Sequence, residues 1–427
     1  MHQRYQHTCI KGPFDPLAIV AKLADSGLLT DYVVYEQDRR WHVAGNPIHE
    51  VRVDAGTIRT GDRTSAWSGT PWEPIHSALH EAPVLDWHAY GWLAFELASG
   101  ARADTSLAHL MVPGTEITVT GDELSVRTLD PDLTDRLRKA LAGTPKAAGA
   151  PKPVDVHDPQ RTYQGHVAHA VAEIGRARLD KVILSRTVTV PFPVDMTATY
   201  VAGRAANTPA RSFLLDLGGI RAAGFSPETV LEASGDGTVT TQPLAGTRAL
   251  TGDPDTDAAL RTELHRDPKE VYEHATSVKL AVEELSSVGV PGSTRVGEFL
   301  TVKERGSVQH LASRVTTDLA AGRTAWDALG AVFPPVTASG IPKPAAYRLI
   351  RELEEEPRGL YAGAVLRAGA DGSLDAALVL RAVYQRGGRA WLRAGAGVVG
   401  ASRPAREYEE TCEKLGSVAP YVVPKEG

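Results

Sequence analysis

Cysteine is scarce in this chain of 427 residues, which has only Cys9 and Cys412, near opposite ends. A secreted disulfide framework needs more cysteines, so we expect a reducing, cytoplasmic location. The N-terminal MHQRYQHTCIKGPFDP lacks the apolar core of a signal peptide. No apolar run approaches the roughly 18 residues of a membrane-spanning helix, so no membrane association is expected. A basic excess is also missing, since the formal net charge is −6, and this argues against sequence-independent nucleic-acid binding.

The composition is that of a globular protein, with 42% hydrophobic and 23% charged residues. The length suits two average domains or one large one. Residues 143–154 are rich in proline, glycine and alanine, and they form either a domain boundary or a long surface loop within one fold. We expect residues 1–150 to form an N-terminal α/β part and residues 155–427 a second region, together making one integrated domain.

Hydrophobic periodicity predicts helices and many short strands joined by tight turns. No Rossmann or P-loop motif is present. Successive strands with short turns favour an α+β fold, with large antiparallel sheets packed face to face and helices on the outside. The predicted helices cover 16–29, 160–179 and 268–287, and a last one starts near Pro404. The predicted strands cover 31–36, 49–54, 91–98, a hairpin at 117–126, 181–190, an antiparallel meander of 211–217, 219–225, 228–234 and 237–244, and segments near 295–319, 361–368, 376–385 and 389–399.

The last helix carries a possible metal site. Glu407, Glu410 and Lys414 are spaced i, i+3 and i+7, which places them within about 60° of one another on one face. Two carboxylates one turn apart suit a hard cation such as Mg²⁺. The alternative is a solvated face with a Glu410–Lys414 salt bridge.

Other polar residues are ambiguous when taken singly. Glu273 lies off the apolar stripe of the long helix, so it points to a cleft or, with its neighbour His274, to solvent. Lys181 opens a strand and is typical of an exposed edge. Glu228 follows Ser226-Pro227 and lies at a turn or in a pocket, and His310 fits a buried strand position.

Ten segments in a fixed order turn these weak signals into a specific resemblance. Together they resemble the chorismate-utilising enzymes, which include anthranilate, aminodeoxychorismate, isochorismate and salicylate synthases. The likeness is strongest over about 155–423, and LLTDYVVYE (28–36) and GWLAFELA (91–98) also resemble the salicylate synthases of siderophore pathways. The segments are KVILSR (181–186), GFSPE (224–228), PLAGTRA (243–249), DPKEVYEH (267–274), ERGSVQHL (304–311), FPPVTASGIPK (333–343), LYAGAV (360–365), LVLRAVY (378–384), RAGAGVV (393–399) and EYEETCEKL (407–415).

Within this family, several residues favour a salicylate synthase. ERGSVQHL has the salicylate-synthase form, and Thr337 resembles the enzymes that go on to eliminate pyruvate. Aminodeoxychorismate synthases carry a lysine in a PIKGT block, which here is Pro243-Leu244-Ala245-Gly246-Thr247. The resemblance therefore implies water addition, with no glutamine amidotransferase partner. One departure is Gln242, where salicylate synthases often have glutamate, and we expect little consequence.

The resemblance also implies roles for individual residues in converting chorismate through isochorismate to salicylate and pyruvate. Water addition needs a base and an acid on opposite ring faces. Free lysine is protonated and free glutamate ionised at neutral pH, so both need unusual environments for these roles. The implied catalytic residues are Lys181 as base, Glu228 as acid, His310 and Thr337; the Mg²⁺ ligands are Glu273, Glu407 and Glu410; Arg381, Tyr361 and Gly395 bind the enolpyruvyl carboxylate; Gly246 and Thr247 line the ring-carboxylate side; and Lys414 lies near the metal.

Two alternatives stay open. One is an isochorismate synthase that releases its product. The other is a non-catalytic sensor of an aromatic acid, which the presence of the acid, the base and three carboxylates disfavours. We expect a monomer.

Thr337 lies in a predicted loop between two helices, bracketed by prolines. Its hydroxyl either bonds its own backbone or holds the enolpyruvyl arm for the elimination of pyruvate. In the second case, Thr337→Ala should release more isochorismate while leaving water addition less affected.

Overall fold

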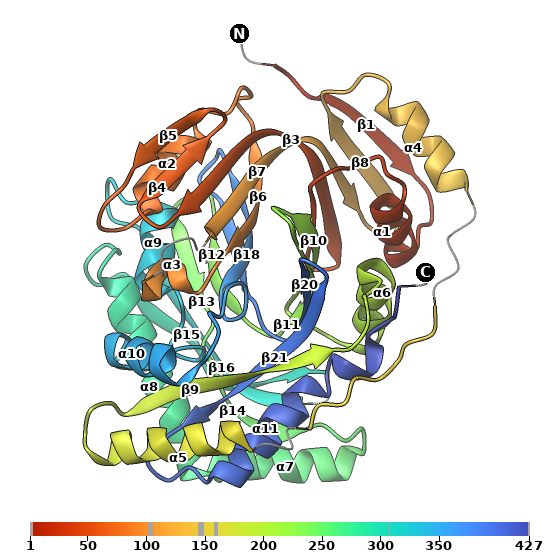
Figure 1. The fold of residues 1–427 in the computed structure, drawn as a ribbon. Coiled ribbons are helices and arrows are strands. Elements are labelled where there is room, and N and C mark those ends of the chain that lie inside the picture. The colour runs from red at the N-terminus through yellow and green to blue at the C-terminus, as the bar shows by residue number, and fades with distance from the viewer. Residues whose placement is uncertain (1–2, 101–105, 144–148, 158–160, 307, 426–427) are drawn as a thin grey trace.

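The computed structural model describes residues 3–100, 106–143, 149–157, 161–306 and 308–425. Its strands are linked by hydrogen bonds into one continuous network of 21 strands within these ranges (Figure 1), and the pairings between the named strands are antiparallel. This confirms the predicted α+β class with large antiparallel sheets.

The first part of the chain forms strands that pair antiparallel with their neighbours in the sheet, with short helices on their faces. The Gly121-Asp122 turn joins two of these strands, β7 and β8, as predicted. The elements are β1 Gln6–Lys11, α1 Pro16–Asp25, β2 Tyr32–Gln37, β3 Arg40–Asp54, β4 Thr57–Thr60, β5 Arg63–Ala66, α2 Trp72–Leu79, β6 His88–Leu93, α3 Glu96–Ser99, β7 Ser106–Val119, β8 Glu123–Thr128 and α4 Leu133–Ala142.

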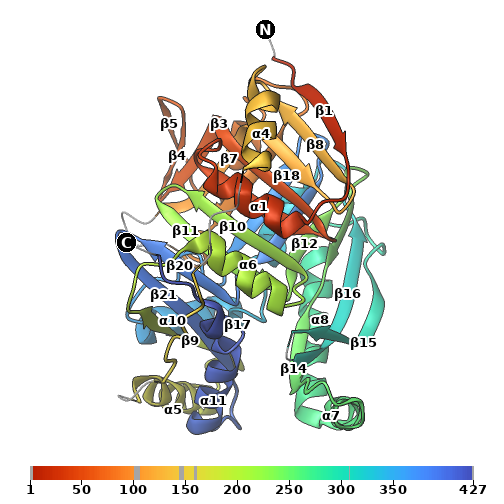
Figure 2. The same ribbon diagram turned by 90° about the vertical axis from the view of Figure 1, so that its right-hand side faces the viewer.

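The second part supplies most of the helices. Both views place α7 and α11 at the end of the molecule opposite the N-terminal strands (Figures 1 and 2). The elements are α5 Thr162–Gly175, β9 Lys181–Val190, α6 Met196–Ala206, β10 Arg211–Leu217, β11 Ile220–Ser226, β12 Thr229–Ala233, β13 Thr238–Thr241, β14 Leu244–Ala249, α7 Pro254–Arg266, α8 Pro268–Ser286, β15 Arg295–Arg305, β16 Val308–Asp318, α9 Ala325–Val332, β17 Gly340–Ile341, α10 Lys343–Leu353, β18 Ala364–Gly369, β19 Leu374–Leu378, β20 Ala382–Arg386, β21 Arg389–Val398, α11 Pro404–Leu415 and a 3₁₀ turn, Ala419–Tyr421.

Strands from the two parts pair directly. β10 pairs with β2, and β18 pairs with β6. The predicted linker is only partly visible, since residues 144–148 lie outside the described residues, as does residue 160 of the predicted helix 160–179. The described stretch 149–157 has no helix or strand, and it is bonded to the C-terminus through Lys152 N to Val422 O at 2.8 Å.

The predicted four-strand meander is wrong in one respect. β10 pairs with β11, and β12 pairs with β13, but β11 and β12 are not neighbours. Instead β11 lies beside β20, and β12 lies beside β19. The strand pairing is interrupted at Ser226-Pro227-Glu228, because proline donates no hydrogen bond to a neighbouring strand. At the same point the Ser226 hydroxyl donates to the Leu378 carbonyl at 2.5 Å. This break delivers Glu228 to the interior.

The predicted strand 91–98 is also too long. β6 ends at Leu93, and Glu96 begins the short helix α3. The Glu96 carboxylate accepts hydrogen bonds from the backbone N–H groups of Arg358 and Gly359, at 2.7 and 3.0 Å. A contact with residues so distant in sequence leaves no local pattern, so the apolar run alone suggested a continuous strand.

The long helix α8 has nearly the predicted bounds, but its buried face is rotated. His274 is fully buried and its Nε2 lies 2.7 Å from the Ser313 hydroxyl, so its predicted solvent exposure is wrong. The neighbouring Glu273 is consequently turned toward β9. No helix in the described ranges is long and apolar enough to cross a membrane.

Candidate active site

Lys181 and Glu273 form the first part of the site. Lys181 is the first residue of β9 and is 4% exposed, which excludes the exposed-edge interpretation. Its ammonium pairs with the Glu273 carboxylate of α8. Burial raises the pKa of Glu273, but the Lys181 charge outweighs it and holds that pKa below its ordinary value. The two side chains therefore form a buried ion pair.

Gly397 of β21 leaves the space for this pair. A Cβ at this position would lie 3.2 Å from Lys181 Cε and 3.6 Å from a Glu273 oxygen. β21 runs antiparallel to β9, with Gly397 opposite Ile183 and Gly395 opposite Ser185. Alternate residues of β21 thus line the site with bare backbone.

Glu228 and Thr337 are in direct contact. Glu228 is 4% exposed, and the Thr337 hydroxyl donates a 2.8 Å hydrogen bond to its Oε1. Burial raises the pKa of Glu228 to about 8, against the opposing effects of the Thr337 hydrogen bond and the Lys181 charge. At neutral pH this carboxyl group is mostly protonated, which is the form a general acid needs.

His310, Thr247 and Arg381 form a second group. His310 of β16 lies opposite Thr247 of β14, and its Nδ1 is 2.9 Å from the Thr247 hydroxyl oxygen. Arg381 donates to His310 Nε2 at 3.0 Å. Because arginine only donates, Nε2 is the acceptor and Nδ1 carries the proton. Burial and the nearby Arg381 and Lys414 charges keep the pKa of His310 well below its ordinary value, so the ring is neutral.

Lys414, Glu410, Gly395 and Tyr361 meet where α11 packs on β21. The Lys414 ammonium donates to the Gly395 carbonyl at 2.9 Å and pairs with Glu410 at 2.7 Å, which is the salt bridge given in the sequence analysis as the alternative to a metal site. A Cβ at Gly395 would lie 2.9 Å from the Tyr361 hydroxyl. Lys414 also contributes to the electrostatic environment of Glu228, Glu273 and Glu407, so its charge is central to the site.

The carboxylates expected to bind metal come from two helices. Burial, with the charge of Glu410, raises the pKa of Glu407; burial and the charge of Glu273 likewise raise the pKa of Glu270, which lies against Gly246. Within the described residues, no group of three or more acidic, histidine or cysteine side chains is arranged to hold a metal. Glu273 and Glu410 are instead paired with lysines. The donor chemistry suits Mg²⁺, while the arrangement is that of two separate ion pairs.

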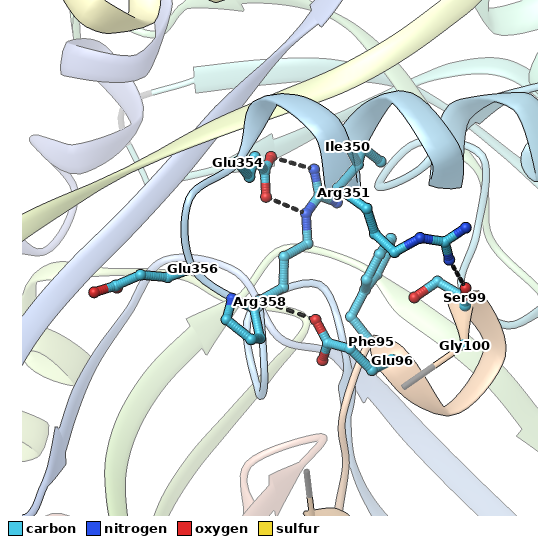
Figure 3. A pocket seen from close by; sticks show the side chains of 10 residues that line it. Phe95, Glu96, Ser99, Gly100, Ile350, Arg351, Glu354, Glu356 and Arg358 are labelled. Atoms are coloured by element: carbon cyan, nitrogen blue, oxygen red, sulfur yellow. Dashed lines mark hydrogen bonds and ion pairs between the residues drawn. The ribbon is translucent and has the colours of Figure 1, made fainter. Parts of the chain in front are cut away.

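A buried ionic network lies behind the site, against a cavity of about 30 Å³ that is too small for a metabolite (Figure 3). Glu354 accepts hydrogen bonds from Ser185, Arg358 and Arg393. Arg358 also donates to the Ile183 carbonyl at 2.6 Å and the Ala338 carbonyl at 2.8 Å. The network therefore ties the Lys181 strand, the Thr337 loop and β21 together.

We expect Glu354→Ala to lower the free energy of unfolding by about 3–5 kcal/mol, because it leaves two buried guanidinium groups without their carboxylate. Urea denaturation followed by fluorescence measures this. The matched control is Glu356→Ala, which removes a pair with Arg389 whose side chains are 49% and 47% exposed, and it should cost less than about 1 kcal/mol. Equal losses in both variants would contradict the assignment.

Most of the residues singled out in the sequence fall into four contact groups, which are Lys181 with Glu273, Glu228 with Thr337, Thr247 with His310 and Arg381, and Lys414 with Glu410, Gly395 and Tyr361. The structure adds Glu270 and Gly397, to which the sequence analysis assigned no role in the site. Glu270 could have been found, since Glu270-x-x-Glu273 repeats the spacing of Glu407-x-x-Glu410. Gly397 carried only the weak signal of a glycine-rich strand.

The architecture and these residues define an enzyme of chorismate metabolism. The chain belongs to the chorismate binding enzyme family, whose sequence pattern matches residues 30–420. It is 42% identical to a salicylate synthase of Mycolicibacterium paratuberculosis over 427 aligned residues, covering 96% of this chain and 95% of that one. It is 40% identical to anthranilate synthase component 1 of Streptomyces coelicolor, over 64% of this chain and 55% of the relative.

Solved structures show the same fold. Anthranilate synthase component I of Streptococcus pneumoniae superimposes with a TM-score of 0.77 at 26% identity, covering 89% of this chain and 92% of that one. The menaquinone-specific isochorismate synthase of Escherichia coli gives a TM-score of 0.78 at 22% identity, covering 98% and 95%.

Proposed function

We propose that this chorismate-utilising enzyme is a salicylate synthase, which converts chorismate through isochorismate to salicylate and pyruvate. The observation that carries the proposal is the buried Glu228 carboxyl group, which is bonded to Thr337, lies within the electrostatic influence of buried Lys181 and has a pKa raised to about 8. The near full-length likeness to a salicylate synthase supports the choice within the family.

In the first step, we assign Lys181 as the base that takes a proton from water as the oxygen attacks the ring. Glu228 gives its proton to the departing ring hydroxyl, which leaves as water. One water enters and one leaves, so the step is an isomerisation. A positioned base and acid are each worth about 10²–10⁴-fold in rate.

Substrate carboxylates need cationic and hydrogen-bonding partners. We assign the enolpyruvyl carboxylate to the Arg381 guanidinium, the Tyr361 hydroxyl and backbone of Gly395, with Gly246 and Thr247 on the ring-carboxylate side. Neutral His310 fixes the Arg381 and Thr247 side chains through its two ring nitrogens. In this proposal His310 acts by orienting these two side chains.

In the second step, a hydrogen moves from the ring to the enolpyruvyl methylene group as the ether C–O bond breaks. This releases pyruvate and leaves the aromatic ring of salicylate. Such a step depends on holding the arm in a compact pose, and we propose that the loop of Thr337 serves this purpose.

We further propose that Mg²⁺ binds at Glu273, Glu407 and Glu410, where it would neutralise the ring carboxylate of the substrate. Occupation of that site requires Glu273 and Glu410 to release their lysine partners in favour of the cation. We propose that the chain works as a monomer. We also propose that it needs no glutamine amidotransferase, since its PLAGTRA segment lacks the lysine of the amine-adding route.

The decisive experiment incubates the protein with chorismate and Mg²⁺ and measures salicylate fluorescence and pyruvate. Equimolar salicylate and pyruvate are expected. Isochorismate as the sole product would identify an isochorismate synthase, and binding without turnover would identify a sensor protein.

The pH dependence of the first step should follow Glu228. The acid is active while protonated, so kcat/KM for chorismate should fall as pH rises through about 8. Thr337→Ala removes a hydrogen bond that favours the ionised carboxylate, so the pKa of Glu228 rises and the alkaline limb moves to higher pH. Thr337→Ser keeps the donor and should leave the limb in place; a downward shift in the alanine variant would contradict the assignment.

The same contact changes the expectation for products. The sequence suggested that Thr337→Ala would affect elimination more than water addition. Because the Thr337 hydroxyl is bonded to Glu228, we expect both water addition and pyruvate elimination to change in Thr337→Ala. The share of isochorismate among the products should rise roughly tenfold, because the enolpyruvyl arm is held less well. Chromatography of the products alongside the pH profile separates the two effects, and an unchanged isochorismate share would leave Thr337 with the acid alone.

A further inference from the structure

Arg305 is a cation of the ERGSVQHL segment for which the proposed mechanism has no use. It ends β15 and is half-buried. Its Nε donates to the Pro227 carbonyl at 3.3 Å, directly before Glu228, and its Nη1 donates to the carbonyl of Glu304 at 3.0 Å. Within the described ranges of the chain, it pairs with no carboxylate.

Arg381 is a second cation without a carboxylate partner in the described part of the chain, and it contacts the backbone of Arg305. Its Nη1 lies 3.4 Å from the Arg305 carbonyl oxygen, and its Nη2 donates to neutral His310. It too has no carboxylate partner among the residues that the structure describes. Burial and the Arg305 charge lower the pKa of Arg381 to about 10, which shows that the two guanidinium groups repel each other.

Several buried arginines of this protein are paired with carboxylates, whereas buried Arg186 donates to the Thr411 hydroxyl and the Val156 carbonyl and lies over the Tyr408 ring. Arg211 pairs with Asp375 at 2.7 Å, and Arg358 and Arg393 both pair with Glu354. Buried charges are normally paired because an isolated one is costly. Two neighbouring guanidinium groups without carboxylate partners, beside the acid Glu228, therefore point to an anion that is supplied from outside the chain.

The hairpin end that carries Arg305 is fixed in place. The Gly306 N–H donates to the Thr208 hydroxyl at 2.8 Å, which fastens it to the segment between α6 and β10. Arg305 is thus held against the site by backbone contacts on both sides, at Pro227 and at Gly306.

We propose that Arg305 is a second substrate-binding cation, which shares with Arg381 the enolpyruvyl carboxylate of chorismate. This inference rests on the proposed function. A planar carboxylate has two oxygens and can accept from two guanidinium groups at once. Its charge would relieve the repulsion between them, so binding would be stronger than at either arginine alone.

The test measures chorismate binding by calorimetry and steady-state kinetics for the full chain and for R305Q. We expect the Kd and KM for chorismate to rise about 10-fold to 100-fold, the range for a lost charge-assisted hydrogen bond, while kcat changes less than about threefold. R305K retains a charge and should recover part of the affinity. The affinity of R305Q should also depend less on salt than that of the wild type.

The matched control is R295Q, at the exposed start of the same strand, where Arg295 pairs with Asp318 at 3.7 Å. It should bind chorismate like the wild type. An R305Q protein with unchanged Kd, or an R305K protein as weak as R305Q with unaltered salt dependence, would overturn the inference. Wild-type protein that binds chorismate but forms no salicylate would instead overturn the proposed function, and the Kd comparison would still decide the role of Arg305.

Discussion

Lys181→Ala is expected to lower the rate of chorismate conversion by about 10²–10⁴-fold, the range for loss of a positioned general base. The lysine is buried at the start of β9, with Gly397 leaving it room, and it is the residue assigned as the base. The elimination of pyruvate from isochorismate adds no water. That activity should therefore survive to a larger degree.

The measurement supplies chorismate and isochorismate separately to the same variant. The control is Lys279→Ala, which removes a lysine that is 75% exposed and pairs with Glu283 on α8, and it should behave like the wild type. Removal of Lys181 also leaves Glu273 without its partner, so binding of both substrates must be measured alongside. Equal loss of both activities with normal binding would show that Lys181 is not specifically the base of the first step.

Removal of divalent ions by EDTA is expected to abolish turnover of chorismate, and added Mg²⁺ should restore it. The reason is the carboxylate set of α8 and α11, which has the oxygen donors that Mg²⁺ prefers. Glu410→Gln keeps the shape of the side chain but removes a charge, so the protein should fold while activity falls by about 10–100-fold.

The control for Glu410→Gln lies on the same helix. Glu409 is 65% exposed and interacts with Arg406 at 3.6 Å, so Glu409→Gln should retain activity and magnesium affinity. Calorimetric titration with Mg²⁺ gives a reading that does not depend on turnover. Full turnover in excess EDTA would contradict the metal assignment.

The ion pairs of the site link these two predictions. Glu273 is an expected metal ligand and also the partner of Lys181, while Glu410 is the partner of Lys414. Each of these two carboxylates therefore forms an ion pair with a lysine, and Mg²⁺ would compete with that lysine for it. We expect magnesium affinity to rise in Lys414→Met, because one competing ammonium is removed, and titration of that variant with Mg²⁺ measures the change.

Regular periodicity let the sequence predict many of the elements by themselves. The helices α8 and α11, the strand β9 and the β7–β8 hairpin all have short-range signals, since their spacing reflects the side that each element buries. Neighbours across the sheet had no such signal. The pairing of β11 with β20 joins residues far apart in sequence, and the predicted meander failed there.

The sequence by itself determined which residue types could do the chemistry and in what order they occur, because the motif segments are contiguous. Only the tertiary structure decided their environments. Lys181 is buried because β21 and α8 cover the start of β9, and the pKa of Glu228 is raised because the Pro227 break turns its carboxyl group into the interior, against the opposing effect of the Thr337 hydrogen bond. Desolvation and contacts between distant segments set these properties, so no local pattern could carry them.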